Sequence, residues 1–271
     1  MRTVNIFDVD VLYGVTNRLE LDLTVPFLTG TLDVVYGTQA DHQLFHYSAG
    51  GIGDVSLQAE YWLNDPTLPS AISGSVSLGI KAPTGSDTVM GTFVGGATAP
   101  IDEGAQLGNG GWELLFRAQG TAALGSGPFM AYGSGYYGMS LTGTSGVHQP
   151  KPDGSPGPLR GVPDTYSARL GAGYLLPVLH DLVVTAGGRI NGVTVKDIIG
   201  GTDLYWRRPG YEIFFEPGLS YTFGLRNFAS ISVPVRVYAK KLDSTLDESL
   251  HRHVGSDFVP FLVIASFGRR F

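Results

Sequence analysis

Charged side chains recur at alternate positions along many short stretches of this sequence, and each row of charges stands opposite a row of apolar residues. Residues at alternate positions of a β-strand point to the same face of the sheet, so each stretch would place its charges on one face. The charged residues in these rows are Asp8, Asp10, Glu20, Asp22, Glu60, Lys81, Glu113, Arg117, Arg169, Arg189, Glu212, Glu216 and Arg236. If the charged faces surround one interior, acids and bases interleave around it. Such an interior predicts either a permeation path that selects solutes by charge and size, or a ladder of salt bridges that fills and stiffens the molecule.

Four of these carboxylates, those of Asp8, Asp10, Glu20 and Asp22, fall on two adjacent stretches close to one short turn. Carboxylate oxygens are the ligands that divalent cations prefer, so a metal site has to be considered. Acids in such a cluster are more often paired with Arg or Lys from neighbouring strands, and we expect ion pairs and no metal. The chain has no Cys, which excludes thiolate ligands and disulfides.

The His residues stand at positions 42, 46, 148, 180, 251 and 253, in segments that lack the alternation. A lipase-like enzyme would need a Ser and a His held together on rigid strands, and no His falls in the middle of a predicted strand. The Gly-rich segments lack the Gly-Lys-Ser/Thr ending of a phosphate-binding loop. The sequence therefore predicts no catalysis and no cofactor.

The length of 271 residues suits one large β-domain, and no linker divides it, so we expect a single domain over 1–271. The net charge of -6 and the charged fraction of 15% provide no basic stripe, which argues against a nucleic-acid partner. No apolar run reaches the roughly 18 residues that a membrane-spanning helix needs.

The elements that would position the charges are long strands, joined alternately by short turns and long loops. We expect strands at 3–13, 18–27, 52–63, 71–82, 112–121, 129–141, 166–176, 182–193, 211–223, 230–240 and 257–271. The long connections lie at 28–51, 84–108, 142–163, 194–209 and 241–255, and the Pro/Gly-rich segment 142–163 would be mobile. Strands of about ten residues with this asymmetry of connections are typical of barrels that cross the outer membrane of Gram-negative bacteria.

The same alternation fits two opposite architectures. In a soluble barrel the apolar row points inward, whereas in an outer-membrane barrel it points outward to lipid and the charged row faces the interior. Strand length, loop asymmetry and the aromatic Phe271 at the end of the last stretch favour the membrane arrangement, with Phe271 as a carboxy-terminal sorting signal. We therefore expect an all-β fold, a transmembrane antiparallel up-and-down β-barrel located in the bacterial outer membrane.

The number of strands leads to a further expectation. Eleven strands are visible, and with all long loops outside the cell the first and last would run in the same direction. Direct closure would then be parallel, which is uncommon in barrels of this kind. We therefore expect about twelve strands, with one strand before residue 3 and a signal peptide before that strand.

Three segments resemble a known family: YGVTNRLELDLTVPF at 13–27, GGIGDVSLQAEYWL at 50–63 and VSLGIKAPTG at 76–85. They are similar to the meta-pathway phenol-degradation family of outer-membrane proteins, in which a YG-[VL]-T-[DN]-RLEL turn, a GxGD strand start and an LPTG-like strand end follow in this order. This chain has Ala82 where the family often has Leu. The resemblance implies a transporter-like barrel for hydrophobic and aromatic compounds, without naming a substrate.

These observations predict an outer-membrane channel or transporter for small hydrophobic or aromatic molecules, without catalysis. Its expected partners are outer-membrane lipid, a small-molecule solute, the barrel assembly machinery during biogenesis, and another protein bound through the long extracellular loops. The alternative is a structural or scaffold barrel, with an interior filled by its own side chains and loops displayed to a partner. A soluble β-sandwich or barrel that binds a ligand is a third possibility.

Overall fold

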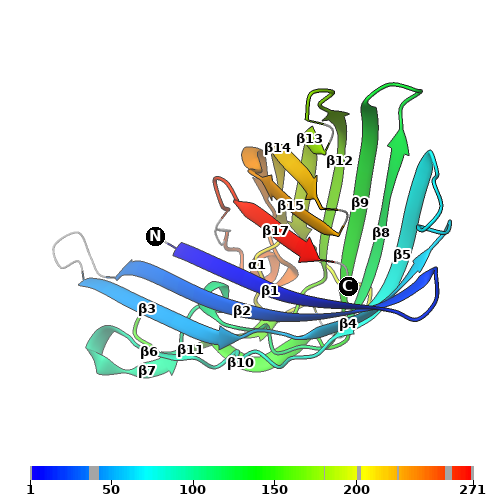
Figure 1. Ribbon diagram of the computed structural model, residues 1–271. Helices are drawn as coiled ribbons and strands as arrows, with labels where there is room; N and C mark the ends of the chain where they lie inside the picture. The colour runs from blue at the N-terminus through cyan, green and yellow to red at the C-terminus, as the bar shows by residue number, and fades with distance from the viewer. Residues whose placement is uncertain are drawn as a thin grey trace.

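The computed structural model describes residues 2–36, 43–179, 181–199, 203–224, 226–253 and 258–269, and its main feature is one strongly curved antiparallel sheet, a half-barrel (Figure 1). The order of neighbours in the sheet is β1 (Arg2–Gly14), β2 (Leu19–Tyr36), β4 (Ser56–Trp62), β5 (Ile72–Lys81), β8 (Glu113–Ala123), β9 (Phe129–Ser140), β12 (Thr165–Leu175), β13 (Leu182–Val193), β14 (Gly210–Phe223), β15 (Asn227–Ser232) and β17 (Ile264–Arg269). The up-and-down, all-β architecture predicted from the alternation is confirmed.

The apolar row of each strand faces outward. Leu57 and Leu78 are 47% and 55% exposed, whereas Glu60 and Ser77, on the other face of the same two strands, are 5% and 8% exposed. This arrangement is the reverse of a soluble barrel, in which the apolar row would be the buried one. The charged rows therefore face the concave interior of the sheet.

The two ends of the sheet run in the same direction, because every neighbouring pair between β1 and β17 is antiparallel. Within the described residues no ladder joins β1 to β17. Eleven strands on the path agree with the eleven visible in the sequence, and the expected twelfth strand and signal peptide stay a prediction.

The connection predicted at 28–51 is wrong, because most of it is strand. β2 continues to Tyr36, and β3 (Gln43–Ile52) pairs with this second half of β2. β3 and β4 thus form one long partner of β2, interrupted at 53–55, where the N–H of Gly53 donates to the carbonyl of Pro26 over 2.8 Å. Alternating apolar and polar residues such as Leu32, Asp33 and Val34 sustain the hairpin.

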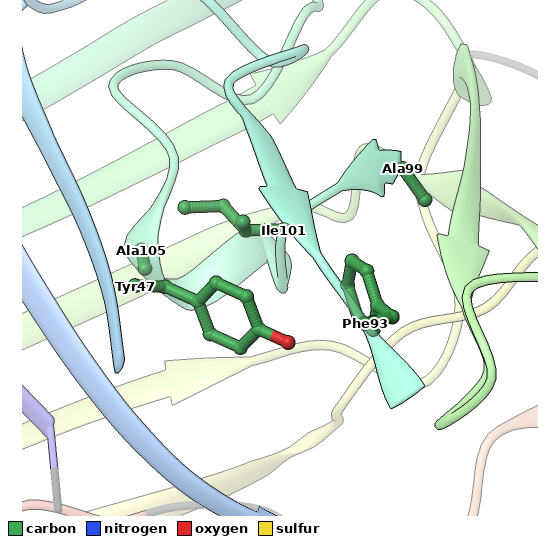
Figure 2. Close-up of a cluster of buried hydrophobic side chains, with 5 residues drawn as sticks. All are labelled: Tyr47, Phe93, Ala99, Ile101 and Ala105. Atoms are coloured by element: carbon green, nitrogen blue, oxygen red, sulfur yellow. The ribbon is translucent and has the colours of Figure 1, made fainter. Parts of the chain in front are cut away.

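The segment 84–108 folds against this hairpin and supplies a small hydrophobic core. It contains β6 (Met90–Thr92), the 3-10 turn η1 (Val94–Gly96), β7 (Thr98–Pro100) and the 3-10 turn η2 (Glu103–Ala105). Figure 2 shows Tyr47 of β3 together with Phe93, Ala99, Ile101 and Ala105 of this segment, all of them buried. The ring centroids of Tyr47 and Phe93 are 5.3 Å apart, and the Tyr47 hydroxyl donates to the carbonyl of Thr92 over 3.0 Å. The core fixes where η2 lies.

The segment 142–163, expected to be mobile, contains a second hairpin of β10 (Thr144–Pro150) and β11 (Pro156–Gly161). Its Gly and Pro residues serve a defined turn, in which the N–H of Lys151 donates to the carbonyl of Ser155 over 3.0 Å. The expected mobility stays a prediction. Figure 1 shows both small hairpins, β6–β7 and β10–β11, at the end of the sheet where the long connections gather.

The predicted strand at 230–240 is also interrupted. β15 and β16 (Val235–Lys241) both pair with β14, and they are separated at Val233 and Pro234. A register shift opposite Ile213 and Phe214 leaves Val237 and Tyr238 both on the outer face, 64% and 50% exposed. This is a β-bulge, because two residues of β16 stand where one would be expected.

The closing strand begins later than the predicted 257. Among the described residues Ile264–Arg269 forms β17, and before it Phe261 makes an isolated bridge to Val235. Phe271, the expected sorting signal, lies outside the described residues. α1 (Thr245–Ser249) stands in the last long connection, capped by Ser244 and Asp247. Among the described residues, no helix has the length and apolar character required to span a membrane.

Candidate site: the polar interior and its loops

Glu216 on β14 is the centre of one ion-pair group on the interior face. Its carboxylate accepts from Arg189 on β13 at 2.7 and 3.2 Å, and lies 2.8 Å from Arg169 on β12. Ser232 on β15 donates to it over 2.9 Å. Glu216 is 1% exposed, so this carboxylate is buried and satisfied from three neighbouring strands. A bidentate guanidinium pair of this kind is both strong and orienting.

Lys81 on β5 connects a second group. Its ammonium lies 2.7 Å from Glu113 on β8 and 3.3 Å from Asp54. Two looser pairs complete the ladder: Arg117 lies 3.7 Å from Asp22, and Arg236 lies 3.7 Å from Glu212. The strands thus bring together most of the acids and bases singled out in the sequence.

The wall formed by β1, β2 and β4 carries mainly acids. Asp8 and Asp10 are exposed on the edge strand β1, and Asp10 accepts from the hydroxyl of Thr24 over 2.8 Å. Glu20 and Asp22 follow on β2. Glu60 accepts from Gln119 over 2.7 Å and also from Ser75. Within the described part of the chain, no group of three or more His, Asp and Glu side chains is placed to hold a metal ion.

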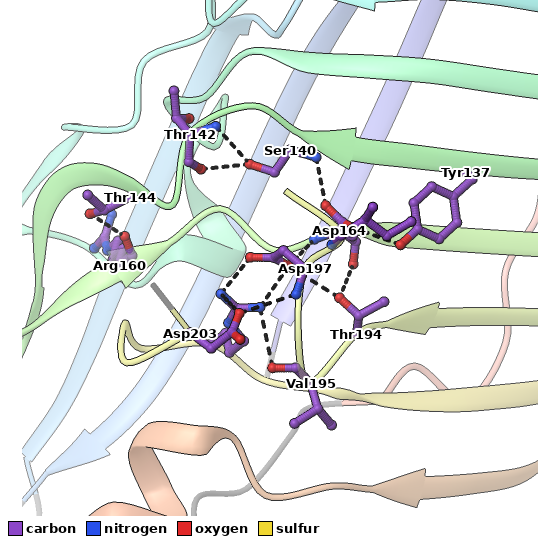
Figure 3. A network of polar contacts seen from close by, with 12 residues as sticks. Tyr137, Ser140, Thr142, Thr144, Arg160, Asp164, Thr194, Val195, Asp197 and Asp203 are labelled. Atoms are coloured by element: carbon purple, nitrogen blue, oxygen red, sulfur yellow. Dashed lines mark hydrogen bonds and ion pairs between the residues drawn. The ribbon is translucent and has the colours of Figure 1, made fainter. Parts of the chain in front are cut away.

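The long connections are tied to one another by a buried polar network (Figure 3). The guanidinium of Arg207, which is fully buried, binds Asp197 through two hydrogen bonds of 2.8 and 2.7 Å. Asp197 in turn accepts from the N–H of Asp164 over 2.9 Å. The Asp164 carboxylate accepts from the N–H of Ser140 over 2.7 Å and from the hydroxyl of Tyr137 over 2.8 Å. Segments 141–164 and 194–209 are therefore fastened to each other and to β9.

A second set of contacts holds the 3-10 turn η2 in place at the interior. Arg208, which precedes β14, binds Asp102 through contacts of 2.6 and 3.2 Å, and Gln149 of β10 donates to Asp102 over 2.8 Å. Arg160 of β11 donates to the carbonyl of Ile101 and, over 3.1 Å, to that of Asp87. On its other side η2 contacts β2 and β3. The 3-10 turn is thus held between β2 and β3 on one side and the β10–β11 hairpin and Arg208 on the other.

Two cavities lie beside η2. The larger, of about 370 Å³, is lined by Arg2, Glu103, Tyr136, Arg208, Glu212 and Phe258 and by parts of Tyr166 and Tyr211. The smaller, of about 280 Å³, is lined by Asp87, Glu103, Asn109, Arg160 and Thr165, among others. Glu103, Gly104 and Thr165 line both cavities, so η2 and the start of β12 form the partition between them.

The two acids of this turn ionise differently. Burial alone would raise the pKa of Asp102, but Arg208 and the hydrogen bonds from Gly104 and Gln149 hold that pKa below its ordinary value. Burial is also the largest influence on Glu103, and there it raises the pKa to about 7; Asp102 adds to the rise, while Arg208, Arg160 and Arg2 oppose it. Asp102 is therefore a structural anion, and Glu103 changes charge near neutral pH.

His46 lies in β3 and His148 in β10, so the expectation that every His stands in a loop or turn is wrong. His46 lies 2.6 Å from Asp33, His253 lies 2.7 Å from Asp243, and His148 contacts the carbonyl of Gly157 over 2.7 Å. His42 and His180 lie outside the described residues. None of the described His side chains has a Ser hydroxyl among these partners, so the geometry provides no nucleophile and base pair of the hydrolase kind.

Sequence reasoning missed the loop residues that line the cavities or fasten the loops around them: Asp102, Glu103, Arg160, Arg207 and Arg208. Each lies in a segment treated as a polar loop, where the period-two pattern gives no information. One signal was available, because Trp206, Arg207 and Arg208 form a bulky and basic run that is unusual for a solvated loop.

No family model matches the chain, and no curated protein matches it. Among solved structures, the crystal structure of the COG4313 outer membrane channel from Pseudomonas putida F1 is similar with a TM-score of 0.56 and 16% identity, over 88% of this chain and 77% of that one. OmpT, an outer membrane protein of Vibrio cholerae, covers 90% of this chain and 91% of its own at 13% identity, with a TM-score of only 0.37. The first likeness shows a shared fold. Together with the apolar outer face, it identifies the chain as a β-barrel protein of the bacterial outer membrane.

Proposed function

We propose that the protein is an outer-membrane channel or transporter for small hydrophobic or aromatic molecules, and that it works without catalysis. The observation that carries this proposal is the cavity of about 370 Å³ on the interior side of η2. Its size falls within the range of small-molecule sites, and it combines aromatic groups with a few convergent charges. Tyr136 and Phe258 offer apolar ring surface, while Arg2, Arg208 and Glu212 offer polar contacts.

The resemblance of three segments to a family linked with aromatic compounds supports the same solute class. The likeness to a solved outer-membrane channel supports the fold on which such transport would take place. Neither names the solute, and the choice among aromatic compounds is left to experiment.

Reconstitution into planar bilayers and liposomes tests the proposal. We expect conductance and uptake of a neutral aromatic alcohol, and both should fall in Thr165→Trp, because the indole would fill space at a residue that lines both cavities. The matched control is Ala168→Trp, on the exposed outer side of the same strand, which should conduct like the wild type. Absence of both conductance and uptake in the wild-type protein would refute the channel.

The scaffold alternative has its own supporting observations, the interior ion pairs and the buried Arg207 network. A barrel filled by its own side chains would show these contacts and no transport. Folded protein that neither conducts nor takes up solute, yet captures a defined protein through its loops, would favour the scaffold.

A further inference from the structure

We propose that Glu103 is the charge filter of the interior: when ionised, its carboxylate disfavours organic anions and favours neutral and cationic solutes. This inference rests on the proposed function, because a filter needs a permeation path. It narrows the solute class to aromatic molecules without a negative charge.

The geometry places the Glu103 side chain where a solute would meet it. It lines both cavities, and Glu103 begins a turn that is fixed on either side. Asp102 is bound by Arg208, and Gln106 donates to the carbonyls of Ile101 and Val89 over 3.0 and 3.2 Å. In the part of the chain that the structure describes, no hydrogen bond or ion pair ends on the Glu103 carboxylate. The backbone of η2 is therefore fixed, and the Glu103 carboxylate is available to interact with a solute.

Charged groups of both signs surround Glu103. The guanidinium groups are those of Arg2 on β1, Arg160 on β11 and Arg208 before β14, and the carboxylates are those of Asp87, Asp102 and Glu212. Glu212 is itself paired with Arg236, 3.7 Å away, and the ionisation of Glu103 changes the net charge around the two cavities by one unit. In an interior of low dielectric, one unpaired charge acts strongly on a passing ion.

The state of Glu103 changes within the physiological range. Burial raises its pKa to about 7, so the side chain is neutral below that pH and negative above it. Tyr136, Tyr166 and Tyr211 also line the larger cavity. We therefore expect the filter to act in alkaline medium and to be lost in acid.

The test measures reversal potentials of the full chain in a KCl gradient across planar bilayers, at about pH 5.5 and about pH 8.5, on either side of the expected transition. In the wild type, the permeability ratio of K⁺ to Cl⁻ should be about twofold or more higher at the alkaline pH. Glu103→Gln should show the acidic ratio at both pH values. At about pH 8.5, the ratio of benzoate uptake to benzyl alcohol uptake into liposomes should rise in Glu103→Gln.

Glu248→Gln is the matched control, because Glu248 is exposed on α1 and its loss removes the same charge outside the cavities. It should behave like the wild type at both pH values. If Glu103→Gln does not fold, the wild-type pH series still decides, since a ratio that is equal at both pH values overturns the filter. Conductance with no pH dependence would thus refute the filter alone, whereas no conductance at all would refute the proposed function.

Discussion

At the scale of residues, Glu216 orients the side chains of two arginines on the interior face. Glu216→Ala would leave Arg169 and Arg189 without their shared partner, and we expect a loss of roughly 2–3 kcal/mol in unfolding free energy. This is less than for a fully dry ion pair, because the Arg169 side chain is 35% exposed. Urea unfolding in lipid vesicles, followed by Trp fluorescence, measures it. Glu20→Gln should change little, since among the described residues no ion pair ends on Glu20, and an equal loss in both variants would contradict the argument.

The sequence predicted the face on which each of these side chains lies but not its partner. Arg169 and Arg189 stand directly opposite each other in the ladder, whereas Glu216 is opposite Gly187, two positions from Arg189. Period-two alternation assigns a face without knowing the register, and partners depend on register. The same limit explains why neither the permeation path nor the ladder of salt bridges could be preferred from the sequence alone.

At the scale of elements, Arg207 fastens two long connections to each other. Arg207→Lys keeps the charge but loses the paired hydrogen bonds to Asp197, so segments 141–164 and 194–209 should open more often. Limited proteolysis of the folded protein in detergent should then cut within these segments faster than in the wild type. Arg226→Lys, in an exposed short turn, is the control. Equal cleavage rates in all three proteins would show that the network does not hold the loops.

Strands that cross the sheet were predictable, whereas the structure inside the long connections was not. The predicted strand at 182–193 has the bounds of β13. The segments 84–108 and 142–163 form hairpins whose apolar residues pack on another loop or on β3. Their apolar and polar residues therefore do not alternate as they do in a strand with one face toward lipid and the other toward the interior. Glu103 and Arg207 were missed for the same reason.

At the scale of the whole molecule, the apolar outer face predicts which substitutions the bilayer resists. Leu78 lies outward near the middle of β5, and Leu78→Arg should lower the unfolding free energy in lipid vesicles by about 2–4 kcal/mol. Gln119→Arg, on the interior face beside Glu60, should cost much less, because it can pair there. Reversed costs, measured by equilibrium unfolding in vesicles, would mean that the faces are assigned the wrong way round.

The bulge at Val237 and Tyr238 shows what depends on the two-residue repeat of each strand, in which one side chain faces lipid and the next faces the aqueous interior. One extra residue exchanges the two faces for the rest of the strand. In β16 the extra residue lies close to a long connection, so only Ala239, Lys240 and Lys241 come after it in the strand. The same insertion in the middle of β5 would move lipid-facing side chains of the rest of that strand to the interior, and interior side chains to lipid. A change in loop length leaves the faces of both flanking strands unchanged. During evolution, such a chain should therefore change by substitution in its strands, and by insertion and deletion of residues in its loops.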